Sequence, residues 1–141
     1  MKKIKSLIVG SGVIGSYLSR LLLKKGHKVI VTSRFSKKTH NNYKILKISK
    51  KINFKKLNVL SKLEIKKVIN DIKPNNIFYL AGQSSIPKSF NLSEETKNSN
   101  FTGAKNFLEI KEKEKINTNF FKANSGYIFK PNKGVIDLKC S

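Results

Sequence analysis

A glycine turn near the start of the chain constrains the possible folds more than any other feature. Residues 10–15 read Gly-Ser-Gly-Val-Ile-Gly and directly follow an apolar run at residues 7–9. A segment with helical spacing of apolar residues comes next and ends at Gly26, because a residue without a Cβ tolerates a left-handed cap. A second apolar run occupies residues 29–31. Strand, glycine turn, helix and strand in this order form the βαβ unit that binds dinucleotides.

The three glycines of the turn have distinct expected roles. Gly10 would permit the tight turn after the strand, and Gly12 would let the backbone approach a pyrophosphate closely. Gly15 would let the helix pack close to the strand. The free amides at the helix start, which include those of Val13 and Ile14, would face the phosphates with the help of the helix dipole. We therefore predict a dinucleotide site, and the alternative is a glycine-rich turn that binds nothing.

Apolar runs and helical periodicity predict the other elements. Ser61 and Glu64 form a capping-box pattern at the start of one helix, which Pro74 ends, and Ser93 or Asn91 would cap a later helix. Alternating strands and helices predict an α/β fold, a Rossmann-type doubly wound parallel sheet. The expected strands cover residues 4–9, 28–32, 43–48, 56–60, 77–81 and 119–123, with a loop at 33–42. The expected apolar helix faces are Val13, Ile14, Tyr17, Leu18, Leu21 and Leu22 at residues 13–25, and Phe101, Ala104, Phe107 and Leu108 in the later helix.

The length allows one domain with a core and leaves no room for a substrate domain beside it. We expect a cofactor-binding domain at residues 1–129 and an irregular tail at residues 130–141. Cys140 is the single cysteine, which fits a reducing cytosol, and no apolar run approaches the length of a membrane span. A cytoplasmic protein with no membrane partner and no metal site is therefore expected.

The chain is strongly basic, with 30 Lys and Arg against 8 Asp and Glu and a formal net charge of +22. Such a charge can indicate nucleic-acid binding. However, Arg20 and Arg34 are the only arginines, and the lysines are spread along a chain that is also rich in Asn and Ile. This pattern resembles the composition that an AT-rich genome produces, so no specific nucleic-acid partner is expected.

The residues after the second strand favour NADP over NAD. An NAD site usually has Asp or Glu about 20 residues after the glycines, where it binds the ribose 2′-hydroxyl. This chain has no carboxylate before Glu64, whereas Arg34 stands where a guanidinium could bind a 2′-phosphate, with Lys37 and Lys38 nearby. The alternative is that Arg34 is one more solvated cation.

Four stretches of sequence carry a resemblance to a known family. Residues 72–85, 89–90, 100–109 and 121–125 resemble motifs of the extended short-chain dehydrogenase/reductases, and the centre of the first stretch reads Tyr-Leu-Ala-Gly-Gln. Within this group, residues 4–129 look most like the N-terminal part of the GDP-mannose 4,6-dehydratases and related NAD-dependent epimerases and dehydratases. The resemblance implies a nucleotide sugar as the partner molecule and leaves an oligomer possible.

The resemblance also implies roles for individual residues. The three glycines would hold the pyrophosphate, and Arg34 would hold the 2′-phosphate. Asn58 and Val59 would lie against the adenine. Ser125 would be the catalytic Ser or Thr that hydrogen-bonds the sugar 4-oxygen. The cofactor's ribose and phosphates would be lined by Leu80, Ala81, Gly82 and Gln83.

The chain departs from the family pattern at several places. Val9 replaces the first glycine of the family's turn, and Tyr127 stands where dehydratases carry a Glu. The Tyr-x-x-x-Lys motif, whose Tyr is the acid/base for the sugar hydroxyl, is absent. We therefore expect an NADP(H)-binding front portion of a nucleotide-sugar dehydratase or epimerase, truncated before the substrate domain and inactive alone. The alternative is a stand-alone NAD(P)-binding module with a regulatory or interaction role.

Overall fold

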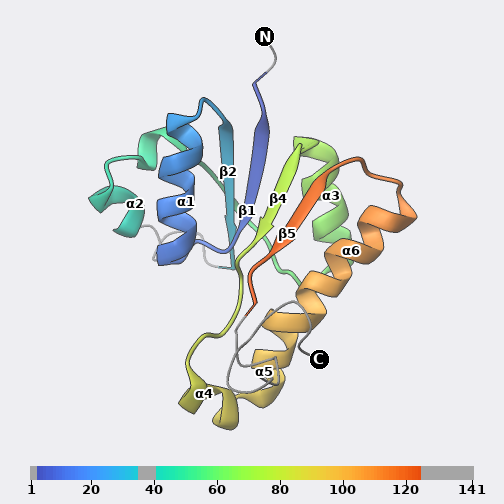
Figure 1. The fold of residues 1–141 in the computed structure, drawn as a ribbon. Coiled ribbons are helices and arrows are strands. Elements are labelled where there is room, and N and C mark those ends of the chain that lie inside the picture. Colours follow the sequence, from blue (N-terminus) through green and yellow to red (C-terminus); the bar gives the residue numbers. More distant parts are fainter. Residues whose placement is uncertain (1–2, 35–40, 125–141) are drawn as a thin grey trace, which may run out of the picture.

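The computed structural model describes residues 3–34 and 41–124, and its centre is a parallel sheet (Figure 1). The five strands have the order β3-β2-β1-β4-β5, and each neighbouring pair is parallel. This arrangement confirms the predicted Rossmann-type doubly wound sheet. The strands are β1 (Lys5–Val9), β2 (Lys28–Ser33), β3 (Asn53–Lys56), β4 (Asn76–Tyr79) and β5 (Asn119–Lys122).

Helices cover the sheet on both faces. On one face, α1 (Val13–Lys24) and α2 (Asn41–Ile45) pack on a core that includes Ile8, and on the other, α3 (Lys62–Ile72) and α6 (Gly103–Lys113) pack on a core that includes Leu7. Because both faces are covered, the central strands β1 and β2 are largely buried apolar runs, whereas β3 and β5, at the two edges of the sheet, are less buried. The remaining elements are η1 (Ser49–Lys51), α4 (Ile86–Asn91), α5 (Ser93–Lys97) and η2 (Asn98–Thr102).

Two of the predicted strands are wrong. The segment 43–48 forms the end of α2 and a turn, because Tyr43 is fully buried and its ring packs edge-on against Phe54 at 5.0 Å. The predicted strand at 56–60 lies too late in the chain, since β3 pairs with β2 only as far as Lys56. Beyond this point the chain leaves the sheet and buries Leu57 in the core. The expected loop at 33–42 also ends earlier than predicted, since α2 begins at Asn41.

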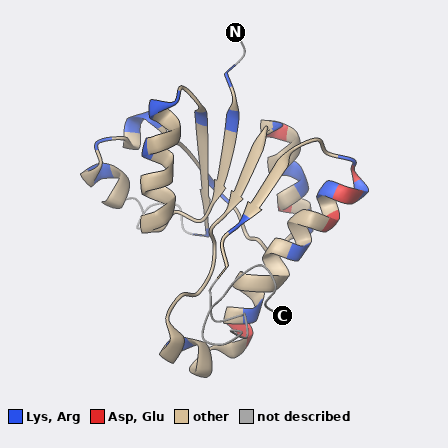
Figure 2. Ribbon diagram, in the orientation of Figure 1, with Lys and Arg blue, Asp and Glu red and all other residues tan. Residues whose placement is uncertain are grey.

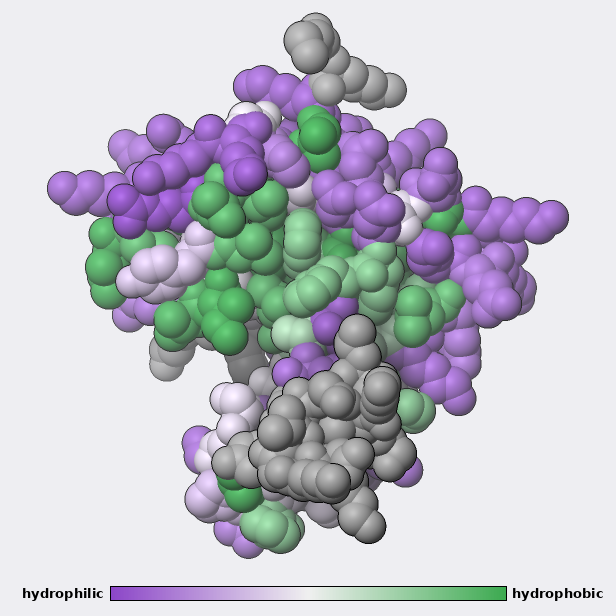
Figure 3. Space-filling view, viewed as in Figure 1, coloured by the Kyte–Doolittle hydropathy of each residue, from purple (hydrophilic) through white to green (hydrophobic). Residues whose placement is uncertain are grey.

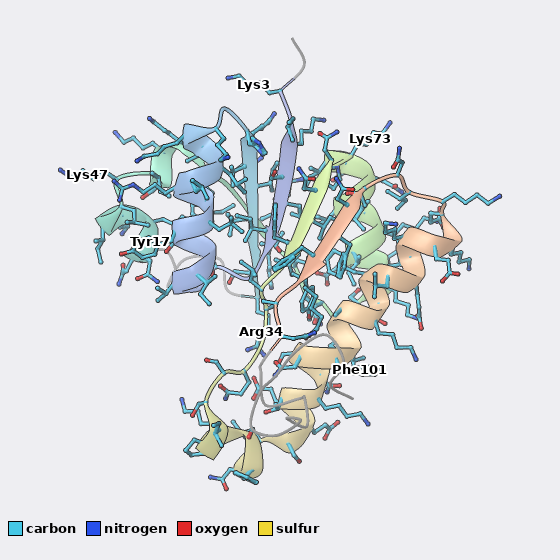
Figure 4. All side chains as sticks on the ribbon, in the orientation of Figure 1. Lys3, Tyr17, Arg34, Lys47, Lys73 and Phe101 are labelled. Atoms are coloured by element: carbon cyan, nitrogen blue, oxygen red, sulfur yellow. The ribbon has the colours of Figure 1, made fainter. Side chains whose placement is uncertain are left out.

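The predicted buried face of α1 is largely wrong. Val13 and Ile14 are 60% and 69% exposed, and Figure 3 shows a hydrophobic surface over this helix. Tyr17 lies on the outer side of the helix in Figure 4. The buried positions are Gly15, Ser16, Ser19 and Leu22. Small residues occupy this face because the helix lies close to the turn after β1.

Buried hydroxyls on α1 are satisfied within the helix. Ser16 Oγ donates to Val13 O, and Ser19 Oγ donates to Gly15 O, both at 2.6 Å. These bonds remove the cost of burying an unpaired hydroxyl. Polar side chains can therefore form the packed face, which leaves the larger apolar residues toward solvent.

The cap of α3 is confirmed. Ser61 is the N-cap residue, and its Oγ accepts a hydrogen bond from Glu64 N at 3.3 Å. The reciprocal bond of a capping box is replaced, since Glu64 Oε2 accepts from Asn58 N at 2.9 Å. The helix ends at Ile72, before Pro74, as predicted.

The cap predicted for the later helix is wrong. The N-cap of α5 is Leu92, without a side-chain hydrogen bond, and Asn91 is the last residue of α4. The predicted apolar face of this helix is half right, because Ala104 and Phe107 are buried whereas Phe101 and Leu108 are exposed.

Among the helices of the described residues, none is long and apolar enough to cross a membrane.

Candidate functional site

A pocket of about 570 Å³ lies at the carboxyl ends of the strands. The sheet order reverses here, since the chain runs from β1 to β2 on one side and β4 flanks β1 on the other. Ligands of doubly wound sheets bind at such a switch point. The lining residues are Val9, Gly10, Ser11, Gly12, Thr32, Ser33, Arg34, Leu57, Asn58, Val59, Leu60, Leu80, Ala81, Gly82, Gln83, Glu94, Glu95, Asn98 and Ser99.

The turn after β1 requires glycine at its first position. Gly10 has a φ of 112°, and its amide donates to Thr32 O at 3.0 Å. A Cβ at this position would lie 2.8 Å from Ala81 N. Gly12 differs, because nothing lies within 4 Å of a Cβ built there. The backbone at Gly12 therefore borders open space that a ligand could occupy.

The start of α1 is suited to an anion. Its N-cap is Gly12, which offers no side-chain cap, and its first turn has no acidic residue. The amides of Val13, Ile14 and Gly15 have no acceptor within the helix, and the helix dipole favours negative charge at this end. Val13, Ile14 and Gly15, which the sequence predicted for the site, are not among the residues that line the pocket. Gly15 lies beneath the turn, where a Cβ would overlap Gly10 O.

The loop after β4 supplies Leu80, Ala81, Gly82 and Gln83, the residues that the sequence predicted for the site. Asn100 of η2 holds this loop by two hydrogen bonds to one residue. Gln83 N donates to Asn100 Oδ1 at 2.7 Å, and Asn100 Nδ2 donates to Gln83 O at 3.0 Å. The sequence analysis assigned no role to Asn100, although it opens a stretch that carries the family resemblance.

Tyr79 connects β4 to the π-helical turn η2. Its hydroxyl donates to Ser99 O at 2.7 Å, and its side chain is 1% exposed. Burial raises the pKa of Tyr79 to about 12. A π-helical turn is often found at a functional site, and this one lies at the wall of the pocket.

Tyr79 predicts a loss of stability at high pH. Because the folded-state pKa of about 12 exceeds the usual value near 10, its contribution is complete below pH 10 and is lost as the pH rises through 12. The two pH units correspond to about 3 kcal/mol at most. Urea unfolding at pH 8, 10 and 11.5 should show a smaller fall in unfolding free energy for Tyr79→Phe than for the wild type. Tyr17→Phe changes an exposed tyrosine and is the control. Its unfolding free energy should fall with pH as much as that of the wild type.

The residues after β3 form another wall. Asn58 Oδ1 accepts from Leu60 N at 3.1 Å, which leaves the Asn58 Nδ2 group as a possible donor to a ligand. The carbonyl of Val59 accepts from the buried Asn106 Nδ2 at 3.1 Å. These contacts fix the position of the two residues that the resemblance places against the adenine.

Arg34 follows β2 and lies at the pocket, as predicted. It is not a lone solvated cation, because its Nη1 donates to Glu95 Oε1 of α5 at 2.9 Å. The charged residues of α1 and α2 are all basic in Figure 2, whereas α5 carries acidic residues. Glu94 and Glu95 were not predicted as lining residues, because they lie far from the glycine turn in the chain.

Several predictions fall outside the described residues. These are Ser125, the candidate catalytic residue, with Tyr127, Lys37, Lys38 and Cys140. The proposed boundary at residue 129 and the tail at 130–141 also lie there.

Comparison with known proteins identifies the family. Residues 7–129 match the family model described as GDP-mannose 4,6 dehydratase. The chain belongs to this family. Its membership in this group of epimerases and dehydratases confirms the resemblance found in the sequence.

The relatives of this family member are distant in sequence and longer than this chain. A UDP-N-acetyl-alpha-D-glucosaminuronate decarboxylase from Bacillus cytotoxicus is 28% identical over 118 residues, which are 82% of this chain and 36% of that protein. An epimerase from Methanothermobacter thermautotrophicus has a TM-score of 0.78 at 22% identity, over 99% of this chain and 41% of its own. A UDP-glucose 4-epimerase from Thermus thermophilus, solved in complex with NAD, has a TM-score of 0.69 at 22% identity. The match covers 80% of this chain and 35% of that one. The chain thus spans about 36% of the curated relative's length.

Proposed function

We propose that this chain is the cofactor-binding portion of a nucleotide-sugar dehydratase or epimerase, and that it binds a pyridine dinucleotide in the pocket at the strand ends. The observation that carries this proposal is the open space at Gly12 beside the uncapped start of α1. A pyrophosphate there would receive hydrogen bonds from the helix amides and would lie at the positive end of the dipole. Solved relatives of similar fold are described in complex with NAD, among them the Thermus thermophilus UDP-glucose 4-epimerase.

The remaining lining residues would hold the other parts of the cofactor. Asn58 and Val59 would contact the adenine, and the loop held by Asn100 would line the ribose and phosphates. The nicotinamide ring, when bound, supplies a hydride acceptor for a sugar hydroxyl. Ser125 would hydrogen-bond the sugar 4-oxygen, by its match to the family's Ser or Thr. GDP-mannose is the sugar nucleotide that the family description favours.

Titration of the full chain with NADPH and with NADH tests this proposal. Binding followed by nicotinamide fluorescence and by calorimetry is expected for at least one of them. A chain that is folded by circular dichroism and binds neither cofactor would overturn the proposal. Single-stranded and double-stranded DNA at physiological salt serve as the comparison for binding that arises from the net charge alone.

We further propose that NADPH binds more tightly than NADH, because Arg34 can donate to a 2′-phosphate. Arg34→Ala is expected to weaken NADPH binding by about tenfold or more, since hydrogen bonds to charged groups contribute roughly 1.5–3 kcal/mol. NADH binding should change much less. Calorimetry on both cofactors measures the difference.

Lys56→Ala is the matched control for Arg34→Ala. Lys56 lies at the end of β3, beside Ser33 in the sheet register, and does not line the pocket. The two variants lose the same charge in the same region. Equal affinities of the wild type for NADPH and NADH would contradict the assignment of Arg34.

A further inference from the structure

An ion pair spans the pocket between two distant parts of the chain. Arg34 follows β2, and Glu95 lies in the first turn of α5, 61 residues later. Arg34 Nη1 lies 2.9 Å from Glu95 Oε1, and both side chains are about half exposed, at 55% and 50%. Both residues line the same pocket. Figure 4 shows Arg34 below the strand ends, between the sheet and the helices that follow β4.

The pair supplies the pocket with the carboxylate that the first half of the sequence lacks. No Asp or Glu precedes Glu64, so β2 has no acidic residue at its end. Glu94 and Glu95 are the only acidic residues among the described residues that line the pocket. The fold therefore brings a carboxylate into the pocket beside Arg34, the residue that the proposed function assigns to the 2′-position of the cofactor.

We propose that Glu95 limits the preference for NADPH by competing with the 2′-phosphate for Arg34. This inference rests on the proposed function. A cofactor with a 2′-phosphate must displace the Glu95 carboxylate from Arg34 and then tolerate its negative charge nearby. A cofactor with a free 2′-hydroxyl leaves the ion pair intact and gains a hydrogen-bond acceptor in Glu95.

The exposure of the pair makes the exchange feasible. A carboxylate that is half exposed regains water when it leaves Arg34, so displacement leaves no buried unpaired charge. The same exposure limits how strongly the pair opposes the phosphate. Glu95 therefore reduces the preference for NADPH that Arg34 alone would produce, without reversing it.

Glu95→Gln and Glu94→Gln form a matched pair of variants for the test. Both changes remove one negative charge from the first turn of α5 and from the pocket wall, but only Glu95 bonds Arg34 in the structure. The full chain is titrated with adenosine 2′,5′-bisphosphate, AMP, NADPH and NADH. Thermal unfolding of each variant verifies that the fold is unchanged.

Glu95→Gln is expected to tighten the binding of adenosine 2′,5′-bisphosphate and NADPH by about fivefold, the factor that the loss of an exposed ion pair produces. AMP and NADH both carry a free 2′-hydroxyl, so the binding of each should weaken slightly. Glu94→Gln should produce a smaller change. In the Arg34→Ala background, the gain of Glu95→Gln for adenosine 2′,5′-bisphosphate should shrink to about the size that Glu94→Gln produces, which is the effect of the charge alone.

Each other outcome has a separate meaning. Equal effects of the two Glu variants would show that only the overall charge of the pocket matters, and would overturn the role of Glu95. A gain for Glu95→Gln that keeps its full size without Arg34 would also overturn it. If the folded wild type binds neither NADPH nor NADH, the proposed function fails first and the inference fails with it.

Discussion

Gly12→Val is expected to abolish dinucleotide binding and to leave the fold in place. No atom lies within 4 Å of a Cβ at Gly12, so a valine side chain fits the protein itself. The same side chain would occupy the space through which a pyrophosphate reaches the amides of α1. Losing two charge-assisted hydrogen bonds weakens binding by about 100-fold or more.

Circular dichroism and a cofactor titration on the same sample measure both parts of this expectation. The unfolding free energy should fall by about 1 kcal/mol or less, because valine is a poorer N-cap residue than glycine. Gly12→Ala places a single methyl group in the same space and should bind with intermediate affinity. A folded Gly12→Val variant that retains its affinity would mean that the turn has only a structural role.

The sequence predicted the centre of the fold well because local rules determine it. An apolar run followed by a glycine turn and a periodic segment leaves few alternatives to a βαβ unit. Gly26 adopts a φ of 80° at the end of α1, and Ser61 caps α3, as the residue types indicated. Each of these features depends on contacts between near neighbours in the chain.

The α1 face was mispredicted because periodicity measures apolar spacing and not the space available. The start of the helix lies so close to the turn after β1 that a Cβ at Gly15 would overlap Gly10 O, and two serines follow on the same buried face. Ile14 and Tyr17 therefore remain outside, although they have the expected helical spacing. The close packing that the sequence analysis assigned to Gly15 was itself the signal that this side of the helix needs small residues.

The contacts that shape the pocket are long-range and could not be found from spacing. Glu95 meets Arg34 across 61 residues, and Asn100 meets Gln83 across 17. The missing carboxylate that favoured NADP was missing only from the residues near β2. The fold supplies a carboxylate from α5 instead, so under the proposed function the choice of cofactor would depend on the competition at Arg34.

Gly15→Ala is expected to destabilise the protein, in contrast to the usual effect of this substitution. Within a helix, replacing Gly by Ala normally stabilises by roughly 0.5–1 kcal/mol. At Gly15 the added Cβ would overlap the carbonyl oxygen of Gly10 and would lie 3.4 Å from Tyr43 Oη. Because the first of these is a backbone atom, the start of α1 must move away from β1.

The cost of this movement should exceed the gain in helix propensity. Overpacking typically costs about 1–3 kcal/mol, so a net loss near 2 kcal/mol and a fall in Tm of roughly 5–10 °C are expected. Thermal unfolding of Gly15→Ala and Gly12→Ala provides the comparison, because the second substitution meets no atom within 4 Å. A higher Tm for Gly15→Ala would show that the helix does not lie against the turn as the structure has it. Cofactor binding by Gly15→Ala should weaken as well, since the amides that would hold the pyrophosphate move with the helix.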